Sequence, residues 1–230
     1  MEITDLASLL KRPTELRDEG WRRDLLLAAP DASLAFDREV MTGPDGFPYV
    51  GLRTEASAVA SGVSTLRREA IGLTDAGLGA VLEPRGEEAA WVFGLGDLAT
   101  LRMFGALLAP SGWSSPSDPE LSRGPSQEVL SEAESTRVGS PNEAYLPSFL
   151  RPHLARYLQG IGIADPYVAL VLRQAQGQRL LAFETGDPRV HHHLQWFLPN
   201  GYATIDLDPA TVRQAGCPLL PPGVIVSSST

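Results

Sequence analysis

The fold is decided by residues 71–107, IGLTDAGLGAVLEPRGEEAAWVFGLGDLATLRMFGAL, because residues 161–197 repeat their pattern ninety residues later. An ungapped alignment of the two stretches shares I-G-x-x-D, then V-L, then F-x-x-G-D. Matched spacing of apolar, glycine and aspartate residues is typical of one supersecondary unit used twice. We therefore predict an internal duplication. The shared pairs are Ile71/Ile161, Gly72/Gly162, Asp75/Asp165, Val81/Val171, Leu82/Leu172, Phe93/Phe183, Gly96/Gly186 and Asp97/Asp187.

In each copy, two short apolar runs flank a polar turn and are followed by a helical stretch. This pattern predicts a β-hairpin and then a helix, with Asp97 and Asp187 as the residues that cap the helix N-termini. The expected strands are Leu78–Leu82 and Ala89–Phe93 in the first copy, and Tyr167–Leu172 and Arg179–Phe183 in the second. The expected helices are Leu98–Leu108 and Pro188–Leu198.

The remaining segments add helices and strands of the same kind. We predict helices over Asp5–Leu10, Thr14–Ala29, Glu55–Arg68 with Thr54 as N-cap, and the segment from Leu150 to Ile161. Strands are expected over Ser33–Val40, Phe47–Arg53 and Tyr202–Leu207, and Asp208 opens a last short helix. Hairpins packed with helices indicate an α+β fold made of two related halves, because the long crossovers of a doubly wound sheet are missing.

A stretch rich in proline, serine and glycine marks the seam between the halves. Such composition lacks the apolar periodicity of a helix or strand and is typical of a linker. We predict an N-terminal α+β domain over residues 1–110, a linker over 111–127 and a C-terminal α+β domain over 128–230.

Charge and composition narrow the classes of partner. The net charge of −9 argues against nucleic acid, whose phosphates need a surplus of Lys and Arg, and against an anionic membrane surface. The single cysteine, Cys217, excludes an internal disulfide and is expected of a reducing compartment. The acidic start lacks the basic region of a secretory signal, and no apolar run reaches the roughly 20 residues that cross a bilayer. We predict a cytoplasmic protein.

The side chains that could bind a metal or take part in catalysis are each explained by a structural role. His191, His192 and His193 are adjacent, so on a helix they point about 100° apart and cannot share one metal ion. Asp187 and His191 have helical ligand spacing, but Asp187 is explained as a cap, and His153 is expected on a helix surface. The shared aspartates fit turns and helix starts better than acid–base pairs. With no phosphate loop and no nucleophile elbow, we predict no catalytic residue, no metal and no cofactor.

The densest aromatic group is Trp196, Phe197 and Tyr202. Core packing is its ordinary explanation. The alternative is a partner-binding patch, since tryptophan and tyrosine are enriched at interface hot spots. These three residues are our candidate binding residues, for a protein or peptide partner.

At Ser126-Gln127-Glu128-Val129-Leu130, followed by Ala133-Glu134-Ser135, the chain resembles the enhanced serine sensitivity protein (SseB) family. The family is similar in running order too: a leading helical segment, an N-terminal α+β domain, this motif and a C-terminal domain. The short seam and the histidine run depart from it. The resemblance implies a cytoplasmic bacterial protein that affects serine tolerance, and it supplies no catalytic residues.

These observations favour a non-enzymatic binding or adaptor protein. The alternative is an enzyme acting on a small metabolite in a cleft between the halves, with Asp165, Asp187, Arg189 and His191 as candidates. A third hypothesis is a metal-dependent regulator that uses the histidines.

Overall fold

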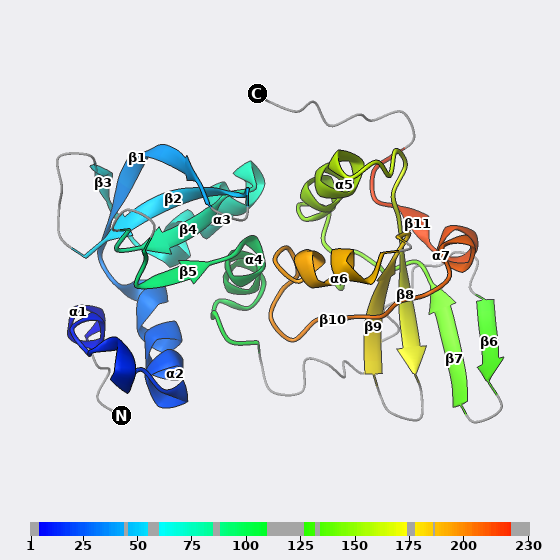
Figure 1. Ribbon diagram of the computed structural model, residues 1–230, viewed down its shortest axis with the longest axis horizontal. Coiled ribbons are helices and arrows are strands. Elements are labelled where there is room, and N and C mark those ends of the chain that lie inside the picture. The colour runs from blue at the N-terminus through cyan, green and yellow to red at the C-terminus, as the bar shows by residue number, and fades with distance from the viewer. Residues whose placement is uncertain are drawn as a thin grey trace. The chain divides into compact units, whose positions relative to one another are not determined.

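The computed structural model describes residues 5–43, 46–54, 60–84, 88–109, 127–131, 134–173, 178–185 and 187–221. The chain divides into two compact units, residues 1–109 and 110–230, named here the N-terminal unit and the C-terminal unit. Each combines helices with a mixed sheet, so the fold is α+β, as predicted (Figure 1). Residues 111–126 of the predicted linker lie outside the described residues, and Gln127 begins a strand.

The N-terminal unit is built on a five-stranded sheet with the order β3-β1-β2-β4-β5. Strands β2 and β4 are parallel, and the other neighbours are antiparallel. Its elements are α1 (Leu6–Leu10), η1 (Thr14–Leu16), α2 (Glu19–Ala28), η2 (Ala29–Asp31), β1 (Leu34–Thr42), β2 (Pro48–Arg53), β3 (Ala60–Ser64), α3 (Leu66–Ala76), β4 (Gly79–Leu82), β5 (Trp91–Phe93) and α4 (Leu95–Phe104).

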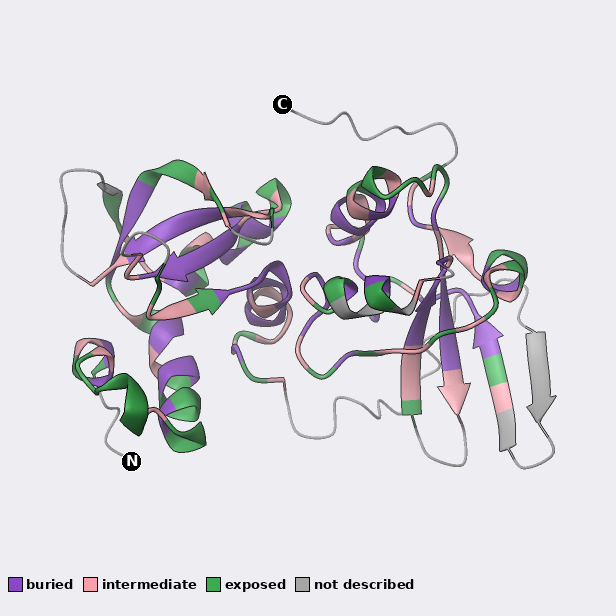
Figure 2. Cartoon of the chain, viewed as in Figure 1, coloured by how far each residue is buried: buried purple, intermediate pink, exposed green. Residues whose placement is uncertain are grey.

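The core of the N-terminal unit lies on one face of this sheet. Side chains of α1, α2, α3 and α4 join alternate strand residues in one apolar cluster. Figure 2 colours most of β2 and β4 as buried. In β1 these residues are Leu34 and Phe36, and in β2 they are Val50 and Leu52. Every second side chain of a strand points to the same face, so one pattern of apolar residues supplies the whole layer.

The predicted helix over Glu55–Arg68, capped by Thr54, is wrong. Ala60–Ser64 forms strand β3, and the helix begins at Leu66 with Thr65 as its N-cap. The Thr65 hydroxyl oxygen accepts a hydrogen bond from the Arg68 N–H at 3.3 Å. Pairing of β3 with β1 is a contact between distant parts of the sequence, which the helical spacing of local apolar residues does not reveal.

The C-terminal unit contains a six-stranded sheet with the order β10-β9-β8-β7-β6, in which β11 also pairs with β8. Strand β10 is parallel to β9, and the other pairs are antiparallel. The elements are β6 (Gln127–Ser131), β7 (Glu134–Gly139), α5 (Arg151–Gly160), β8 (Tyr167–Arg173), β9 (Gln178–Phe183), α6 (Pro188–Leu194), β10 (Ala203–Thr204), α7 (Pro209–Ala215) and β11 (Cys217–Pro218).

Helices cover both faces of the C-terminal sheet. Figure 1 shows α7 on one side of β8 and β9, with α5 and α6 on the other. Val212 and Ala215 of α7 pack with Ala169 and Val171 of β8. The alternate β8 residues Val168 and Leu170 are also buried, so this strand is apolar on both sides. Burial on both faces explains its nearly continuous apolar run.

The predicted duplication is not confirmed. The order helix, strand, strand, helix recurs as α3-β4-β5-α4 and α5-β8-β9-α6. However, β4 runs parallel to its inner neighbour β2, whereas β8 runs antiparallel to β7. The hairpin registers differ as well: Phe93 pairs with Ala80, and Phe183 pairs with Val168 rather than with Leu170, the counterpart of Ala80.

Candidate functional site

Two of the three predicted binding residues lie in the interior of the C-terminal unit. Phe197 and Tyr202 are buried, whereas Trp196 is half-buried. The Tyr202 ring stacks on Tyr145 with ring centres 4.6 Å apart, and its hydroxyl donates to the Tyr145 carbonyl oxygen. Phe197 lies 5.3 Å from the Tyr157 ring of α5. This packing supports the ordinary explanation for Phe197 and Tyr202, and use of the group as a partner surface stays a prediction.

The histidine run lies in α6, as expected from the helical prediction. His193 is exposed and stacks near Tyr157, with ring centres 6.3 Å apart; the side chains at 191 and 192 are not described. Burial raises the pKa of Tyr157, and the negative charge of Asp187 adds to this rise. His153, expected on a helix surface, is instead buried in α5, so that prediction is wrong. Among the described residues, no group of three His, Cys, Asp or Glu side chains could hold a metal ion.

The two aspartates predicted as caps behave differently. Asp187 is the N-cap of α6, and its carboxylate accepts from the Arg189 N–H at 2.9 Å. The Arg189 guanidinium donates to the same carboxylate, and these bonds lower the pKa of Asp187 to about 2. Asp97 is not an N-cap: α4 begins at Leu95, and the Asp97 carboxylate accepts from the N–H of the preceding N-cap, Gly94, at 2.9 Å.

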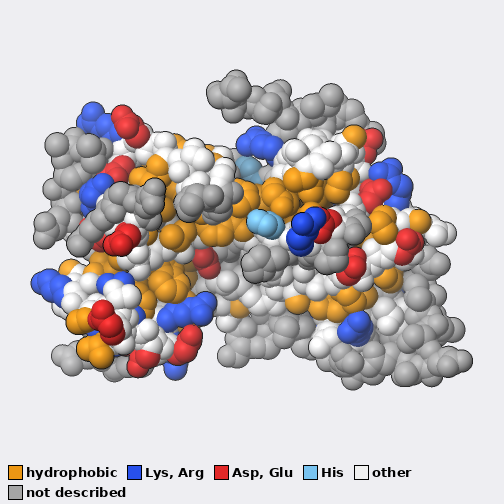
Figure 3. Space-filling view, viewed as in Figure 1, with side chains coloured by type: hydrophobic (Ala, Val, Ile, Leu, Met, Phe, Trp, Pro, Cys, Tyr) orange, Lys and Arg blue, Asp and Glu red, His pale blue; other side chains and the backbone are white. Residues whose placement is uncertain are grey.

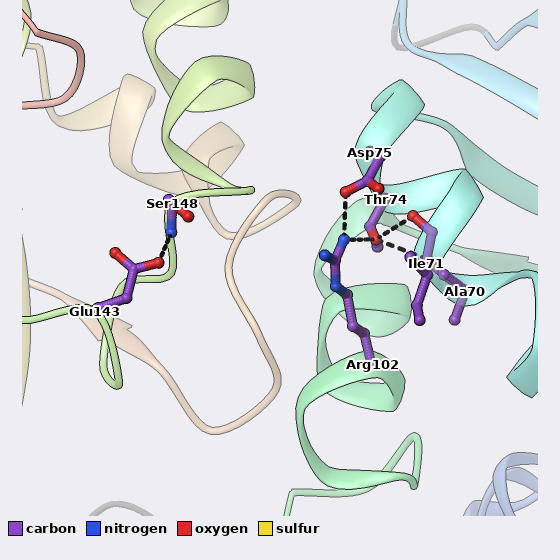
Figure 4. A network of polar contacts seen from close by, with 7 residues as sticks. All are labelled: Ala70, Ile71, Thr74, Asp75, Arg102, Glu143 and Ser148. Carbon is purple, nitrogen blue, oxygen red and sulfur yellow. Dashed lines mark hydrogen bonds and ion pairs between the residues drawn. The ribbon is translucent and has the colours of Figure 1, made fainter.

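Asp75, expected at a turn or helix start, lies in the last turn of α3. Arg102 of α4 donates to its carboxylate at 2.5 Å and to the Thr74 hydroxyl at 2.8 Å (Figure 4). That hydroxyl also lies 2.7 Å from the Ala70 carbonyl oxygen. The network ties two helices together, so Asp75 has a structural role. The same figure shows the Glu143 carboxylate accepting from the Ser148 N–H in the segment before α5.

Several other carboxylates of the described chain are likewise paired with arginines. The Arg213 guanidinium donates to both oxygens of Glu184 at 2.7 and 2.8 Å and to the Asp165 carbonyl oxygen at 3.1 Å. Its bonds to Glu184 raise the pKa of Arg213. Asp31 and Arg67 form a similar pair, in which the pKa of Asp31 is lowered by the Arg67 hydrogen bonds. Accordingly, acidic and basic side chains are interspersed on the face in Figure 3.

The second face of the N-terminal sheet holds a buried ion pair. Asp37 of β1 is 8% exposed, and both of its oxygens accept from Arg53 of β2 at 3.2 Å. A Cβ atom at Gly51 would lie 2.1 Å from the Asp37 carboxylate, so glycine makes room for it. The β1 register shifts at this point, as at a β-bulge. A fixed pair of this kind stabilises one sheet register.

Strand β3 presents an edge without protective charges. It ends the sheet order and pairs with β1 on one side. Its sequence, ASGVS, contains no charged residue and no proline. Val63 is 63% exposed, and a Cβ at Gly62 would meet no atom within 4 Å. Sheets usually protect edges with lysine, proline, bulges or shortness, because unpaired backbone groups attract further strands. Of these devices, β3 has a bulge-like irregularity in its pairing with β1, between Ala60 and Gly62, but neither charge nor proline.

The other described strands at the sheet ends, and β11 beside β8, differ from β3 in sequence or in length. The sequence of β6 includes Glu128, and that of β11 includes Pro218. Strand β5 has three residues and β10 has two. Among the strands that the structure describes at sheet ends, β3 is therefore the longest one without charge or proline.

A polar pocket lies between the α1–η1 segment and the β4–β5 connection. It is lined by Leu10, Thr14, Arg17, Glu83, Glu88, Ala89 and Ala90 and has a volume of about 180 Å³. Glu83 has a φ of 49°, in the left-handed region that non-glycine residues rarely adopt. Its carboxylate accepts from the N–H and hydroxyl of Thr54 at 2.6 and 2.7 Å. This pocket brings a guanidinium, a hydroxyl and two carboxylates together.

The C-terminal unit has an apolar pocket of about 420 Å³ beside β11. Arg151 lines it and donates to the Cys217 sulfur at 3.5 Å, to the Leu146 carbonyl oxygen at 3.1 Å and to the Pro141 carbonyl oxygen at 3.1 Å. Arg151 therefore joins three segments of this unit. Cys217, predicted to be no nucleophile, sits in a strand pairing with Val168.

Comparison with known proteins gives no match: no family model, no curated protein and no solved structure is similar to this chain. The resemblance to the enhanced serine sensitivity family therefore stays a prediction. In the portion of the chain with described coordinates, no helix is long and apolar enough to cross a membrane.

Neither the β3 edge nor the polar pocket was predicted from the sequence. Thr65 was the available signal for the edge, because a second good N-cap residue eleven positions after Thr54 would have left room for a strand between them. The pocket residues Arg17 and Glu83 lie 66 positions apart and carry no shared motif. Only the fold brings them together.

Proposed function

We propose that the chain is a cytoplasmic, non-enzymatic binding protein that takes an extended segment of a partner protein as an added strand at β3. The observation that carries this proposal is the charge-free edge of β3. Strand addition uses backbone hydrogen bonds for affinity and alternate side chains for specificity. The partner would therefore need an uncharged, extended segment.

The exposed Val63 gives this edge an apolar contact. Val63 pairs with Ala35 of β1, and at 63% exposure it lies open to a side chain on an adjacent strand. Cross-strand apolar contacts contribute up to about 1 kcal/mol each. The preferred segment therefore carries a β-branched or aromatic residue at the position opposite Val63.

The test is selection of linear peptides from a displayed library on the full chain, followed by amide hydrogen exchange. Strand addition predicts that a selected peptide slows exchange within residues 60–64. Replacing Val63 by Lys places a charge on the edge and should weaken binding at least about fivefold, since about 1 kcal/mol corresponds to that factor.

The matched control is Ile71→Lys. Ile71 is 56% exposed on α3, so the substitution makes the same chemical change away from the β3 edge. Binding that survives Val63→Lys, exchange protection confined to other elements, or a library that yields no binder would each contradict the proposal.

A further inference from the structure

We propose a small-molecule site in the polar pocket of the N-terminal unit, for a small primary amine that carries an oxygen acceptor at its other end. This site is separate from the β3 edge and does not depend on strand addition. Three features of the pocket support this site: its volume, the charged groups that line it, and the hydrogen bonds that hold Glu83 and Arg17.

The two carboxylates of the pocket are the acceptors for the amine end of the ligand. Thr54 donates both of its hydrogen bonds to Oε1 of Glu83. Within the part of the chain that the structure describes, these bonds leave Oε2 of Glu83 to accept from a ligand. Glu88 lines the same pocket and is exposed. An ammonium group has three donors and no acceptor, so it matches two carboxylates. Charge-assisted bonds of this kind are among the stronger hydrogen bonds.

The backbone holds Glu83 in place before a ligand arrives. Its φ of 49° turns the chain at the end of β4, and its N–H donates to the Leu52 carbonyl oxygen at 2.8 Å. A non-glycine residue in this region costs stability and persists where its surroundings fix it. The carboxylate is therefore oriented by the fold.

Arg17 and Thr14 supply the donors for the oxygen acceptor at the other end of the ligand. The Arg17 guanidinium donates to the Arg12 and Leu10 carbonyl oxygens at 3.1 and 3.3 Å through Nε and Nη2, and it lies 4.8 Å from the centre of the Trp21 ring. These contacts hold the Arg17 guanidinium in place. They use Nε and Nη2 and leave Nη1. With the Thr14 hydroxyl, Nη1 can donate to a ligand oxygen.

The pocket volume indicates the size of the ligand part that it can hold. A cavity of about 150 Å³ holds a benzene molecule, so about 180 Å³ has room for roughly six non-hydrogen atoms. A four-carbon chain with a nitrogen at one end and an oxygen at the other has that size. Leu10, Ala89 and Ala90 provide the apolar wall beside such a chain.

The experiment titrates the isotope-labelled full chain with 4-aminobutan-1-ol and follows backbone amide NMR shifts. Two probes of equal size serve as controls: butane-1,4-diol lacks the ammonium group, and pentan-1-amine lacks the oxygen. We expect saturable shifts at residues 83 and 88–90 with the amino alcohol, and binding weaker by about tenfold for each control, as expected when a site's polar group loses its partner.

Variants separate the site from general charge attraction. Glu83→Gln keeps an acceptor for Thr54 but removes the charge, and should weaken binding of the amino alcohol about tenfold. Glu19→Gln changes the net charge equally on the exposed face of α2 and should leave binding unchanged. Unchanged exchange of the Thr54 amide would show that Glu83→Gln preserves the fold.

The proposal is overturned if the amino alcohol causes no saturable shifts, or if the diol binds equally well. Equal losses in Glu83→Gln and Glu19→Gln would also overturn it, because they would indicate attraction to the negative chain as a whole. None of these results would bear on peptide binding at β3.

Discussion

The two units use glycine in different ways to bring layers close together. In the C-terminal unit, Gly216 follows α7, and a Cβ there would lie 2.3 Å from the Val168 carbonyl oxygen and 2.6 Å from that of Val212. In the N-terminal unit, a Cβ at Gly51 would meet the Asp37 side chain. Backbone atoms are held by the sheet, whereas a carboxylate can turn. Position 216 of the C-terminal unit is therefore less tolerant of added volume than position 51 of the N-terminal unit.

The largest effect is expected from Gly216→Ala. The added methyl group collides with the carbonyls of Val168 in β8 and Val212 in α7, so the backbone at residue 216 must shift relative to both, at a cost of about 3 kcal/mol, the upper end for overpacking. Hydrogen exchange in the C-terminal unit measures this loss separately from the N-terminal unit. Gly160→Ala is the control, because its Cβ would meet no atom within 4 Å. A loss in Gly160→Ala as large as that in Gly216→Ala would contradict the comparison.

Gly51→Ala should cost less, about 1–2 kcal/mol, because the Asp37 carboxylate can rotate at the expense of its bonds to Arg53. The double variant with Asp37→Ala removes the collision. We therefore expect the losses in the free energy of unfolding of the two single variants to add up to more than the loss in the double variant. A double-mutant cycle in urea measures this coupling. Strict additivity would show that the side chain does not occupy this space.

Removing an N-cap in either unit should have similar, smaller effects. Asp18 accepts from the Trp21 N–H at 2.8 Å in α2, and Asp208 accepts from the Thr211 N–H at 3.1 Å in α7. Replacing either aspartate by Ala should lower the free energy of unfolding by about 1 kcal/mol, and replacing it by Asn instead should keep most of that free energy. Hydrogen exchange should place each loss in its own unit, and a loss shared by both units would show that they unfold together.

The smallest expected effect is the loss of the stabilisation by Asp187 at low pH. Its pKa of about 2 in the folded chain lies below the ordinary value of 3.8, so the stabilisation is complete above about pH 5 and is lost progressively as the pH falls through about 2. Arg189→Gln should raise the pKa of Asp187 towards 3.8, because the Arg189 side chain makes the largest contribution to the shift. Carboxyl-carbon NMR titration measures this, and an unchanged pKa would mean that backbone capping alone is responsible.

Local signals predicted much of this fold. The expected strands Ser33–Val40 and Phe47–Arg53 correspond to β1 and β2, which pair antiparallel. Asp187 and Asp208 begin helices as predicted, since capping involves neighbouring residues alone. Alternating or continuous apolar runs identified β4, β8 and β9.

Features that depend on distant residues could not be predicted in this way. Matched spacing in the two hairpins indicated the order of elements, but strand direction depends on β2 and β7, which lie outside the repeated stretch. Val63 has the spacing of a helix face, yet pairing with β1 makes it part of a strand. His153 is buried in α5, in a unit whose sheet contains strands from both before and after this helix in the sequence. The polar pocket depends on the same kind of long-range contact.

The late position of β11 has a consequence for biosynthesis. Each described strand and helix of the N-terminal unit precedes residue 109, so this unit can complete its core while the ribosome is still translating the rest. The C-terminal unit closes only when Cys217–Pro218 reaches β8, about fifty residues behind its partner strand. A nascent chain stalled shortly before that point would carry a finished first unit and an incomplete second one, which makes it the form most exposed to chaperones and proteases.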